Sequence, residues 1–135
     1  MPDAERIENV VWAMATAADA RDWKAIRDTF ADEVDFDYTS VAGGSPARLK
    51  AKDLVAGWKE GLGRYKQTKH NFSDLAVTVE GDLATCTFTG QATHVKENGE
   101  RWTCGGDYTY RFARTPQGWK ATAARFDMKW EQGTR

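Results

Sequence analysis

The sequence has few of the residues that hold small proteins together through cross-links or metal ions. It contains two cysteines, Cys86 and Cys104, and two histidines. Two cysteines in a chain of this length do not form a disulfide framework, and their positions lack the spacing of zinc ligands. Phosphate loops, nucleophile elbows and dinucleotide fingerprints are also missing from the sequence. We therefore expect no bound metal and no cofactor.

An excess of charge of one sign and a long apolar run are lacking as well. Lysine plus arginine is 19 and aspartate plus glutamate is 20, which gives a net charge of −1. A nearly neutral chain has no electrostatic reason to hold nucleic acid or an anionic membrane, and no stretch approaches the ~20 apolar residues of a membrane span. The first residues, MPDAER, do not form a basic region followed by an apolar one. We expect a cytoplasmic protein without nucleic-acid or membrane partners.

What remains is the composition of one folded domain, which we assign to residues 1–135. Hydrophobic residues make up 41% and charged residues 29%, as is typical of soluble globular proteins. Apolar side chains recur at helical spacing over residues 4–18. Asp22 stands where an N-cap would begin a second helix, and a third helix is predicted near residues 54–62.

Strands are predicted before the third helix and throughout the second half of the chain. Residues 34–38 alternate between apolar and acidic side chains, which indicates a half-buried strand, and residues 42–48 are rich in glycine and are expected to form a loop. Turn sequences then divide the remainder into four antiparallel strands, at residues 67–79, 83–96, 101–114 and 118–130. Helices followed by an antiparallel meander predict the α+β class.

The turn at Asn98-Gly99 also bears on the two cysteines. A two-residue loop there would place Cys86 opposite Arg111 and Cys104 opposite Thr93, so we predict free thiols. A bulge at Gly105-Gly106 could shift this register, but by too little to bring the two cysteines together.

His70 and Asp19 are the first candidates for chemistry. His70 shares a strand face with Thr68 and the apolar Phe72, so its ring is expected to point inward. It is either a satisfied core or rim histidine or a general acid–base, since imidazole titrates near neutral pH. Asp19 lies in the last helical turn, where a carboxylate opposes the helix dipole and needs compensation. It is either a solvated turn residue beside Arg21 or the partner that fixes the tautomer of His70.

Tyr38 and His94 are the second pair of candidates. Tyr38 continues the inward face of Val34 and Phe36, and its hydroxyl needs a partner if it is buried. It is either an ordinary core tyrosine or a donor to a substrate oxygen. His94 ends a strand whose inner face carries small residues that leave room for a cavity. It either faces that cavity or lies in solvent at the hairpin end.

The remaining carboxylates are weaker candidates. Asp35 and Asp37 alternate away from the core face, so solvent is their expected setting. Whether Asp107 faces the pocket depends on the bulge at Gly105-Gly106. The predicted wall of a substrate pocket is mainly aromatic and consists of Phe36, Trp58, Phe72, Phe88, Tyr108 and Asp107.

Several motifs together resemble the nuclear transport factor 2-like superfamily and, within it, the SnoaL-like and scytalone dehydratase-like branch. They are ADARDW at residues 18–23, DYTS at 37–40, QTKH at 67–70 and ATH at 92–94, with residues 118–130 similar to the closing strand of that branch. The resemblance covers almost the whole chain. It implies a cone-shaped barrel, made of a strongly bent antiparallel sheet that three helices from the N-terminal half close around a pocket.

The resemblance also implies residue roles. Scytalone dehydratase-like enzymes use an aspartate–histidine dyad, and Asp19 and His70 fall at the matching positions. Tyr38 matches the tyrosine that polarises the substrate carbonyl, and His94 matches a histidine that assists near the leaving hydroxyl.

Some pocket positions depart from the dehydratase pattern. Its second tyrosine is replaced by Ala18, and a pocket serine and asparagine correspond to Gly106 and Tyr108. The resemblance therefore does not carry the scytalone substrate itself.

The resulting hypothesis is a cofactor-independent, dehydratase-like lyase that acts on a small apolar carbonyl substrate. One alternative is an isomerase, either with the same proton abstraction or ketosteroid isomerase-like, with Asp37 as base and a protonated acid near Asp107. Another is a non-catalytic binding or partner module. A homo-oligomer, dimer or trimer, is expected to pack through the threonine-rich outer face of the second meander strand, with Tyr110 and Trp102 nearby.

Overall fold

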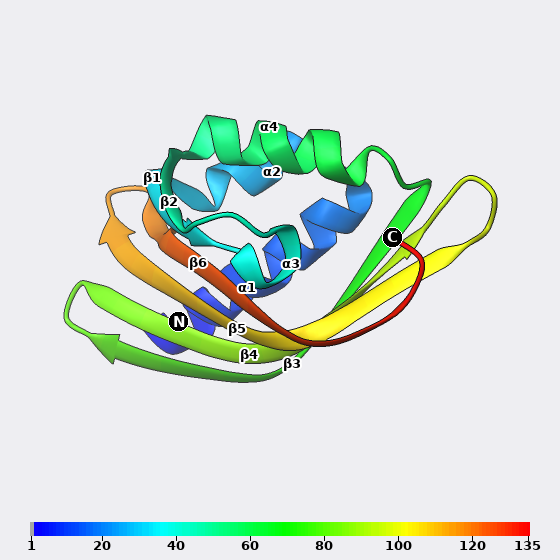
Figure 1. Ribbon diagram of the computed structural model, residues 1–135. Coiled ribbons are helices and arrows are strands. Elements are labelled where there is room, and N and C mark those ends of the chain that lie inside the picture. Colours follow the sequence, from blue (N-terminus) through cyan, green and yellow to red (C-terminus); the bar gives the residue numbers. More distant parts are fainter. Residues whose placement is uncertain (1) are drawn as a thin grey trace.

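The computed structural model describes residues 2–135 and shows helices lying on the concave side of one bent sheet (Figure 1). The helices of this described part are α1 (Asp3–Ala20), α2 (Trp23–Asp28), α3 (Thr39–Ala42) and α4 (Ala51–Leu62). The strands are β1 (Phe30–Asp37), β2 (Ala47–Lys50), β3 (Gln67–Glu80), β4 (Leu83–Val95), β5 (Arg101–Thr115) and β6 (Gly118–Gly133). No helix within residues 2–135 is long and apolar enough to cross a membrane.

The sheet has the strand order β2-β1-β6-β5-β4-β3. Strands β3 to β6 form the predicted antiparallel meander, and the α+β class is confirmed. The strongly bent antiparallel sheet has one exception to its strand direction, because β1 pairs with β6 in parallel. The sheet is strongly curved but does not close, and β2 and β3 remain its two edges. Alternation within β1 predicts a strand but does not say which strand lies beside it.

The segment expected as a loop between β1 and α4 contains two short elements. A four-residue helix, α3, follows β1, and β2 pairs antiparallel with β1 with Leu49 opposite Val34. The structure therefore has four helices within residues 2–135, where three were expected. Elements of four residues are too short to show a period, which is why the pattern did not predict them.

The first two helices follow from local chemistry. Arg21 ends α1 with φ of 60°, and its N–H bonds to the carbonyls of Ala17 and Ala18. Asp22 caps α2 as predicted, since its carboxylate accepts a hydrogen bond from Ala25 N. The Arg21 guanidinium then donates to Leu62 O at 2.8 Å and to a second carbonyl past the end of α4. The C-terminal ends of α1 and α4 are thereby tied together.

The β4–β5 hairpin has a three-residue loop, one residue longer than predicted. Lys96 N bonds to Glu100 O, and Gly99 takes the left-handed conformation at φ 88° that such a loop requires. The register shifts by one residue, so Cys86 lies opposite Tyr110 and Cys104 opposite Ala92. Both thiols are free and buried, and the prediction that they are unpaired is confirmed.

This register also decides which residues of β5 face inward. Tyr110 and Trp102 are 4% and 7% exposed and belong to the core, so they do not lie on the outer face where packing against a partner was expected. The threonines of β4 do alternate outward, and self-association through them stays a prediction.

Glycines let the sheet bend around the aromatic side chains on its inner face. A Cβ at Gly90 would lie 2.7 Å from the Phe72 ring and 2.9 Å from the Tyr108 ring. A Cβ at Gly106 would overlap the carbonyl oxygen of Asp127. The expected bulge at Gly105-Gly106 is present, but it interrupts the pairing with β6 and leaves the pairing with β4 regular.

Candidate active site

A cavity of about 470 Å³ lies between the concave face of the sheet and helices α1 and α4. Its wall is mostly apolar and aromatic, as is usual for small-molecule sites. The predicted residues that line it are Phe36, Tyr38, Trp58, His70, Phe72, His94 and Tyr108. The alternation of β1, β3, β4 and β5 thus brings side chains from four strands to one cavity, and Tyr38 joins them from the residue after β1.

Asp19 and His70 form a close pair at the edge of this cavity. Asp19 Oδ1 lies 2.7 Å from His70 Nδ1, and the backbone N–H of His70 donates to both carboxylate oxygens, at 3.1 and 2.9 Å. Because a carboxylate only accepts hydrogen bonds, Nδ1 carries a proton and Nε2 is the nitrogen left to the cavity. The pair therefore has the geometry of an oriented imidazole base.

The fold brings this pair together through an edge strand. Within residues 2–135, no strand pairs with β3 on its outer side, so the N–H of His70 needs a partner from elsewhere, and α1 supplies it with Asp19. The side chains of His70 and Asp19 are only 16% and 21% exposed. The donors around Asp19 provide the compensation that a carboxylate at a helix C-terminus requires.

His94 lines the same cavity in a different electrostatic setting. Its Nδ1 lies 3.0 Å from Trp102 O, so Nδ1 donates and Nε2 is an acceptor. The ring is stacked on Trp102, with centroids 4.3 Å apart, and also contacts Tyr65. Burial lowers the pKa of His94 to about 4, against the opposing effect of the Trp102 carbonyl. At neutral pH His94 is therefore an uncharged hydrogen-bond acceptor. A solvent position at the hairpin end is excluded.

Two tyrosine hydroxyls meet in the wall of the same cavity. Tyr38 Oη and Tyr110 Oη are 2.6 Å apart. Burial raises the pKa of Tyr110 to about 12 and raises those of Tyr38 and Tyr108 well above their ordinary value. Phe36 stacks on Tyr38 with a centroid distance of 4.6 Å. These hydroxyls stay protonated at neutral pH and can donate to a ligand oxygen.

Two residues of the predicted wall do not reach the cavity. Asp107 is exposed, because it lies opposite Thr89 on the outer face of the sheet, and its assignment to the pocket is wrong. Phe88 is buried behind the wall, with its ring 4.8 Å from Phe72 and 4.8 Å from Tyr108. It supports the lining rings from the next layer.

The carboxylates needed for the ketosteroid isomerase-like alternative are also misplaced. Asp37 accepts hydrogen bonds from the hydroxyl and the backbone N–H of Thr39, and these, with the Arg125 charge, lower the pKa of Asp37. Neither Asp37 nor Asp107 lines the cavity. That arrangement of base and protonated acid is therefore not present.

Sequence reasoning missed several residues of the wall. They come mainly from β5, β6 and the segment after α4, and comprise Tyr65, Trp102, Tyr110, Phe126 and Arg135. The alternation of β5 held the signal for two of them, since Trp102 and Tyr110 share parity with Tyr108. Arg135 lies two residues after the end of β6 and lines the cavity with its guanidinium 4.9 Å from the Trp102 ring.

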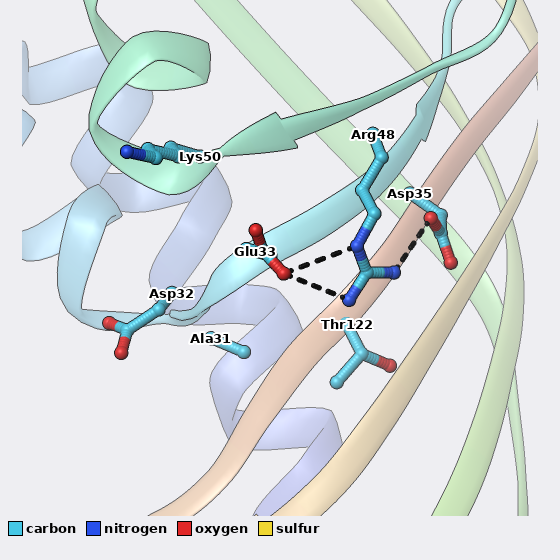
Figure 2. A pocket seen from close by; sticks show the side chains of 7 residues that line it. All are labelled: Ala31, Asp32, Glu33, Asp35, Arg48, Lys50 and Thr122. Atoms are coloured by element: carbon cyan, nitrogen blue, oxygen red, sulfur yellow. Dashed lines mark hydrogen bonds and ion pairs between the residues drawn. The ribbon is translucent and has the colours of Figure 1, made fainter.

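A second hollow, open to solvent, lies over β1 and β2 at the other edge of the sheet (Figure 2). Arg48 bridges Glu33 at 3.2 Å and Asp35 at 3.1 Å there, and all three side chains are more than half exposed. Such charges satisfy one another in water and add little stability. Within residues 2–135, no group of three or more His, Cys, Asp or Glu side chains is placed to hold a metal ion.

The fold defined by these elements is the nuclear transport factor 2-like fold. The SnoaL-like domain family matches residues 1–125, and the chain belongs to this family. No curated protein sequence is significantly similar to the chain.

Three solved structures illustrate the similarity. A candidate aromatic ring hydroxylase from Novosphingobium aromaticivorans is 27% identical with a TM-score of 0.88, covering 99% of this chain and 96% of that chain. A candidate scytalone dehydratase from the same species is 14% identical with a TM-score of 0.84, covering 96% and 85%. A hexachlorocyclohexane dehydrochlorinase, LinA type 3, from Novosphingobium barchaimii is 16% identical with a TM-score of 0.77, covering 95% and 87%.

Proposed function

We propose that this protein is a cofactor-independent lyase that eliminates water from a small, apolar carbonyl compound. The observation that carries the proposal is the 2.7 Å contact between Asp19 and His70, whose ring lines an apolar cavity. A pocket that only binds ligands has no need for an imidazole held in one tautomer by a carboxylate. Two of the similar structures are named for eliminations, a dehydratase and a dehydrochlorinase, which supports a lyase.

The proposed reaction begins with His70 as the base. Nε2 of His70 takes the proton α to the carbonyl, and the electron pair of the broken C–H bond forms the carbon–carbon double bond of an enolate. Asp19 stabilises the imidazolium that results. Tyr38 donates a hydrogen bond to the enolate oxygen, which lowers the barrier because the donor is in place before charge develops.

The second step returns the proton. The enolate re-forms its carbonyl, the bond to the β-hydroxyl breaks, and the imidazolium of His70 protonates the departing oxygen so that water leaves. His94 does not serve as the acid, because its low pKa and its bonded Nδ1 leave it neutral with an accepting Nε2. We assign His94 the role of accepting a hydrogen bond from a substrate hydroxyl, which orients that group.

An isomerase is the second candidate, and the same geometry favours it. One oriented imidazole can remove a proton and return it to another carbon without expelling a group. The two reactions share the first step and differ in whether the substrate has a leaving group at the β-carbon. The product distinguishes them, since elimination yields an unsaturated carbonyl compound and water.

The test measures proton abstraction directly. Flat β-hydroxy ketones in deuterated buffer are followed by NMR for exchange at the α-carbon and for new alkene signals, using the native protein, His70→Ala and the control Asp107→Asn. We expect His70→Ala to slow exchange by about 10²–10⁴-fold, the usual contribution of a positioned base, and the exposed control to match the native rate. Exchange in His70→Ala within a few-fold of native would reject the mechanism.

A further inference from the structure

Two arginines lie where the cavity opens to solvent. Arg64 follows α4 and Arg135 follows β6, and both line the cavity although both are also exposed. A guanidinium has five N–H donors. Arg64 uses one of them, from Nε to Gly61 O at 3.3 Å. Arg135 uses three, two to Glu131 and one to Val41 O. Both arginines therefore keep N–H groups that have no partner among residues 2–135 and that a ligand can use.

Positive charge is left unmatched at this opening. Glu131 pairs with Arg135 at 2.9 Å, but no carboxylate within residues 2–135 forms an ion pair with Arg64. Asp53 also lines the cavity, but it lies in the first turn of α4, whereas Arg64 follows the last turn. Because charges in a partly enclosed site are screened less than charges in open water, the end of the opening at Arg64 attracts an anionic group.

A pair of aromatic rings links the two arginines. The guanidinium carbon of Arg64 lies 5.9 Å from the centre of the Tyr65 ring, and that of Arg135 lies 4.9 Å from the Trp102 ring. The Tyr65 and Trp102 rings are stacked with their centroids 6.3 Å apart. Tyr65 is 7% exposed and lines the cavity, yet its hydroxyl has no hydrogen-bond partner within residues 2–135. A buried hydroxyl needs a partner, and a ligand oxygen can supply it.

We propose that Arg64, Arg135 and Tyr65 form a binding site for the carboxylate of an otherwise apolar ligand whose body occupies the cavity. The free N–H groups of a guanidinium match the two oxygens of a carboxylate, and the hydroxyl of Tyr65 adds a neutral donor. The proposal deepens the proposed function and rests on it only in taking this ligand to be the substrate. The reacting carbons then lie at His70, while the acidic group stays at the opening.

The experiment compares two aromatic ligands of nearly the same shape that differ in charge, 2-naphthoate and 2-naphthamide. At neutral pH the acid is ionised and the amide is uncharged. Their affinities for the native protein, Arg64→Gln, Arg135→Gln and Tyr65→Phe are measured by calorimetry. Arg48→Gln is the matched control, because Arg48 is an exposed arginine that does not line this cavity. Arg64→Lys tests whether charge alone restores binding.

We expect each glutamine variant of the two arginines to weaken naphthoate binding by about 5- to 10-fold, between the values for exposed ion pairs and for hydrogen bonds to charged groups. Tyr65→Phe should weaken it by about 2- to 10-fold. Naphthamide binding should not change, Arg64→Lys should keep most of the preference for naphthoate, and Arg48→Gln should match the native protein. Equal affinity of the native protein for both ligands, or no measurable binding of either, would overturn the proposal. Equal weakening of both ligands in the arginine variants would overturn it too, because the arginines would then only shape the cavity.

The same ligands separate this proposal from the proposed function. His70→Ala is expected to retain the native preference for naphthoate, because His70 pairs with Asp19 and makes no hydrogen bond to either arginine. If His70→Ala keeps full α-proton exchange while the arginine variants lose the preference, the lyase mechanism fails and the carboxylate site stands. If His70→Ala loses exchange while the arginine variants keep the preference, the carboxylate site is rejected and the base remains.

Discussion

The two histidines of this chain share one cavity and differ in nearly every other respect. They stand on adjacent strands, where the register places His70 opposite Ala92 and His94 opposite Thr68. His70 has a carboxylate on Nδ1, whereas His94 has a backbone carbonyl there and aromatic rings on its faces. A carboxylate stabilises an imidazolium, while burial among rings opposes one. In the proposed mechanism, one residue type thus supplies a base at one position and a neutral hydrogen-bond acceptor at the other.

The chemical role proposed for each histidine depends on the partner of its Nδ1 and not on whether its ring lines the cavity. Both rings line the same space and both have an accepting group on Nδ1. In the proposed mechanism only His70 takes a proton from the substrate, because only its Nδ1 has a charged acceptor as partner. Breaking that pair therefore has the largest expected effect.

Asp19→Asn is expected to slow α-proton exchange by about 10²–10⁴-fold. An amide at this position no longer stabilises the imidazolium and no longer fixes a single tautomer. His70 then lacks the charged Nδ1 partner that distinguishes it from His94. NMR exchange rates for the native protein and the variant measure the effect, with circular dichroism to verify folding. Asp107→Asn, on the exposed outer face, serves as the matched control. A rate for Asp19→Asn within a few-fold of native would show that the carboxylate is not needed.

The second prediction concerns His94 and the stability of the folded protein at low pH. The pKa of His94 is about 4 in the folded protein against an ordinary 6.5, so the unfolded chain takes up the proton first as the pH falls. The neutral His94 ring therefore makes its full contribution to the free energy of unfolding above about pH 6.5. This contribution, about 3 kcal/mol, is lost progressively as the pH falls toward about 4. Acid therefore favours unfolding over this range.

The measurement compares urea unfolding of the native protein and His94→Gln at about pH 7 and about pH 4.5. We expect the native protein to lose about 2 kcal/mol more than the variant between these two conditions. The difference between the two proteins removes the contribution of the carboxylates, which titrate in both. Equal losses would mean that His94 does not resist protonation, and the contrast with His70 would then disappear.

Much of this arrangement could be predicted from local patterns. The turn residues and the two-residue alternation place the four meander strands nearly at their observed bounds, and alternation alone directs His70 and Tyr38 toward the interior. These features depend on neighbours in sequence, which a pattern records directly. Local patterns leave open whether Asp19 is solvated or pairs with His70, and the family resemblance favours the pair, since this contact joins a helix end to a strand 51 residues away.

The features that escaped prediction depend on register and on distant contacts. The Asn98-Gly99 sequence fits hairpin loops of two and of three residues. This difference of one residue in loop length sets the register between β4 and β5, and the register decides whether Asp107 or Tyr108 faces the cavity. The burial of His94 depends on Trp102 and Tyr65, which come from another strand and from the segment after α4. A pattern read along β4 alone does not contain them.

The smallest expected effect separates stacking from hydrogen bonding around His94. Trp102 Nε1 donates to Glu131 at 2.9 Å while the indole ring covers His94. Trp102→Phe retains a ring over His94 but loses this hydrogen bond, so we expect the free energy of unfolding to fall by about 1 kcal/mol. The pKa of His94 is expected to stay low in this variant, because the ring is still covered. Trp102→Ala removes the cover, and an NMR titration of the His94 ring should then show its pKa moving up toward 6.5. A large rise already in Trp102→Phe would mean that the Glu131 contact, and not burial beneath the ring, keeps His94 neutral and different from His70.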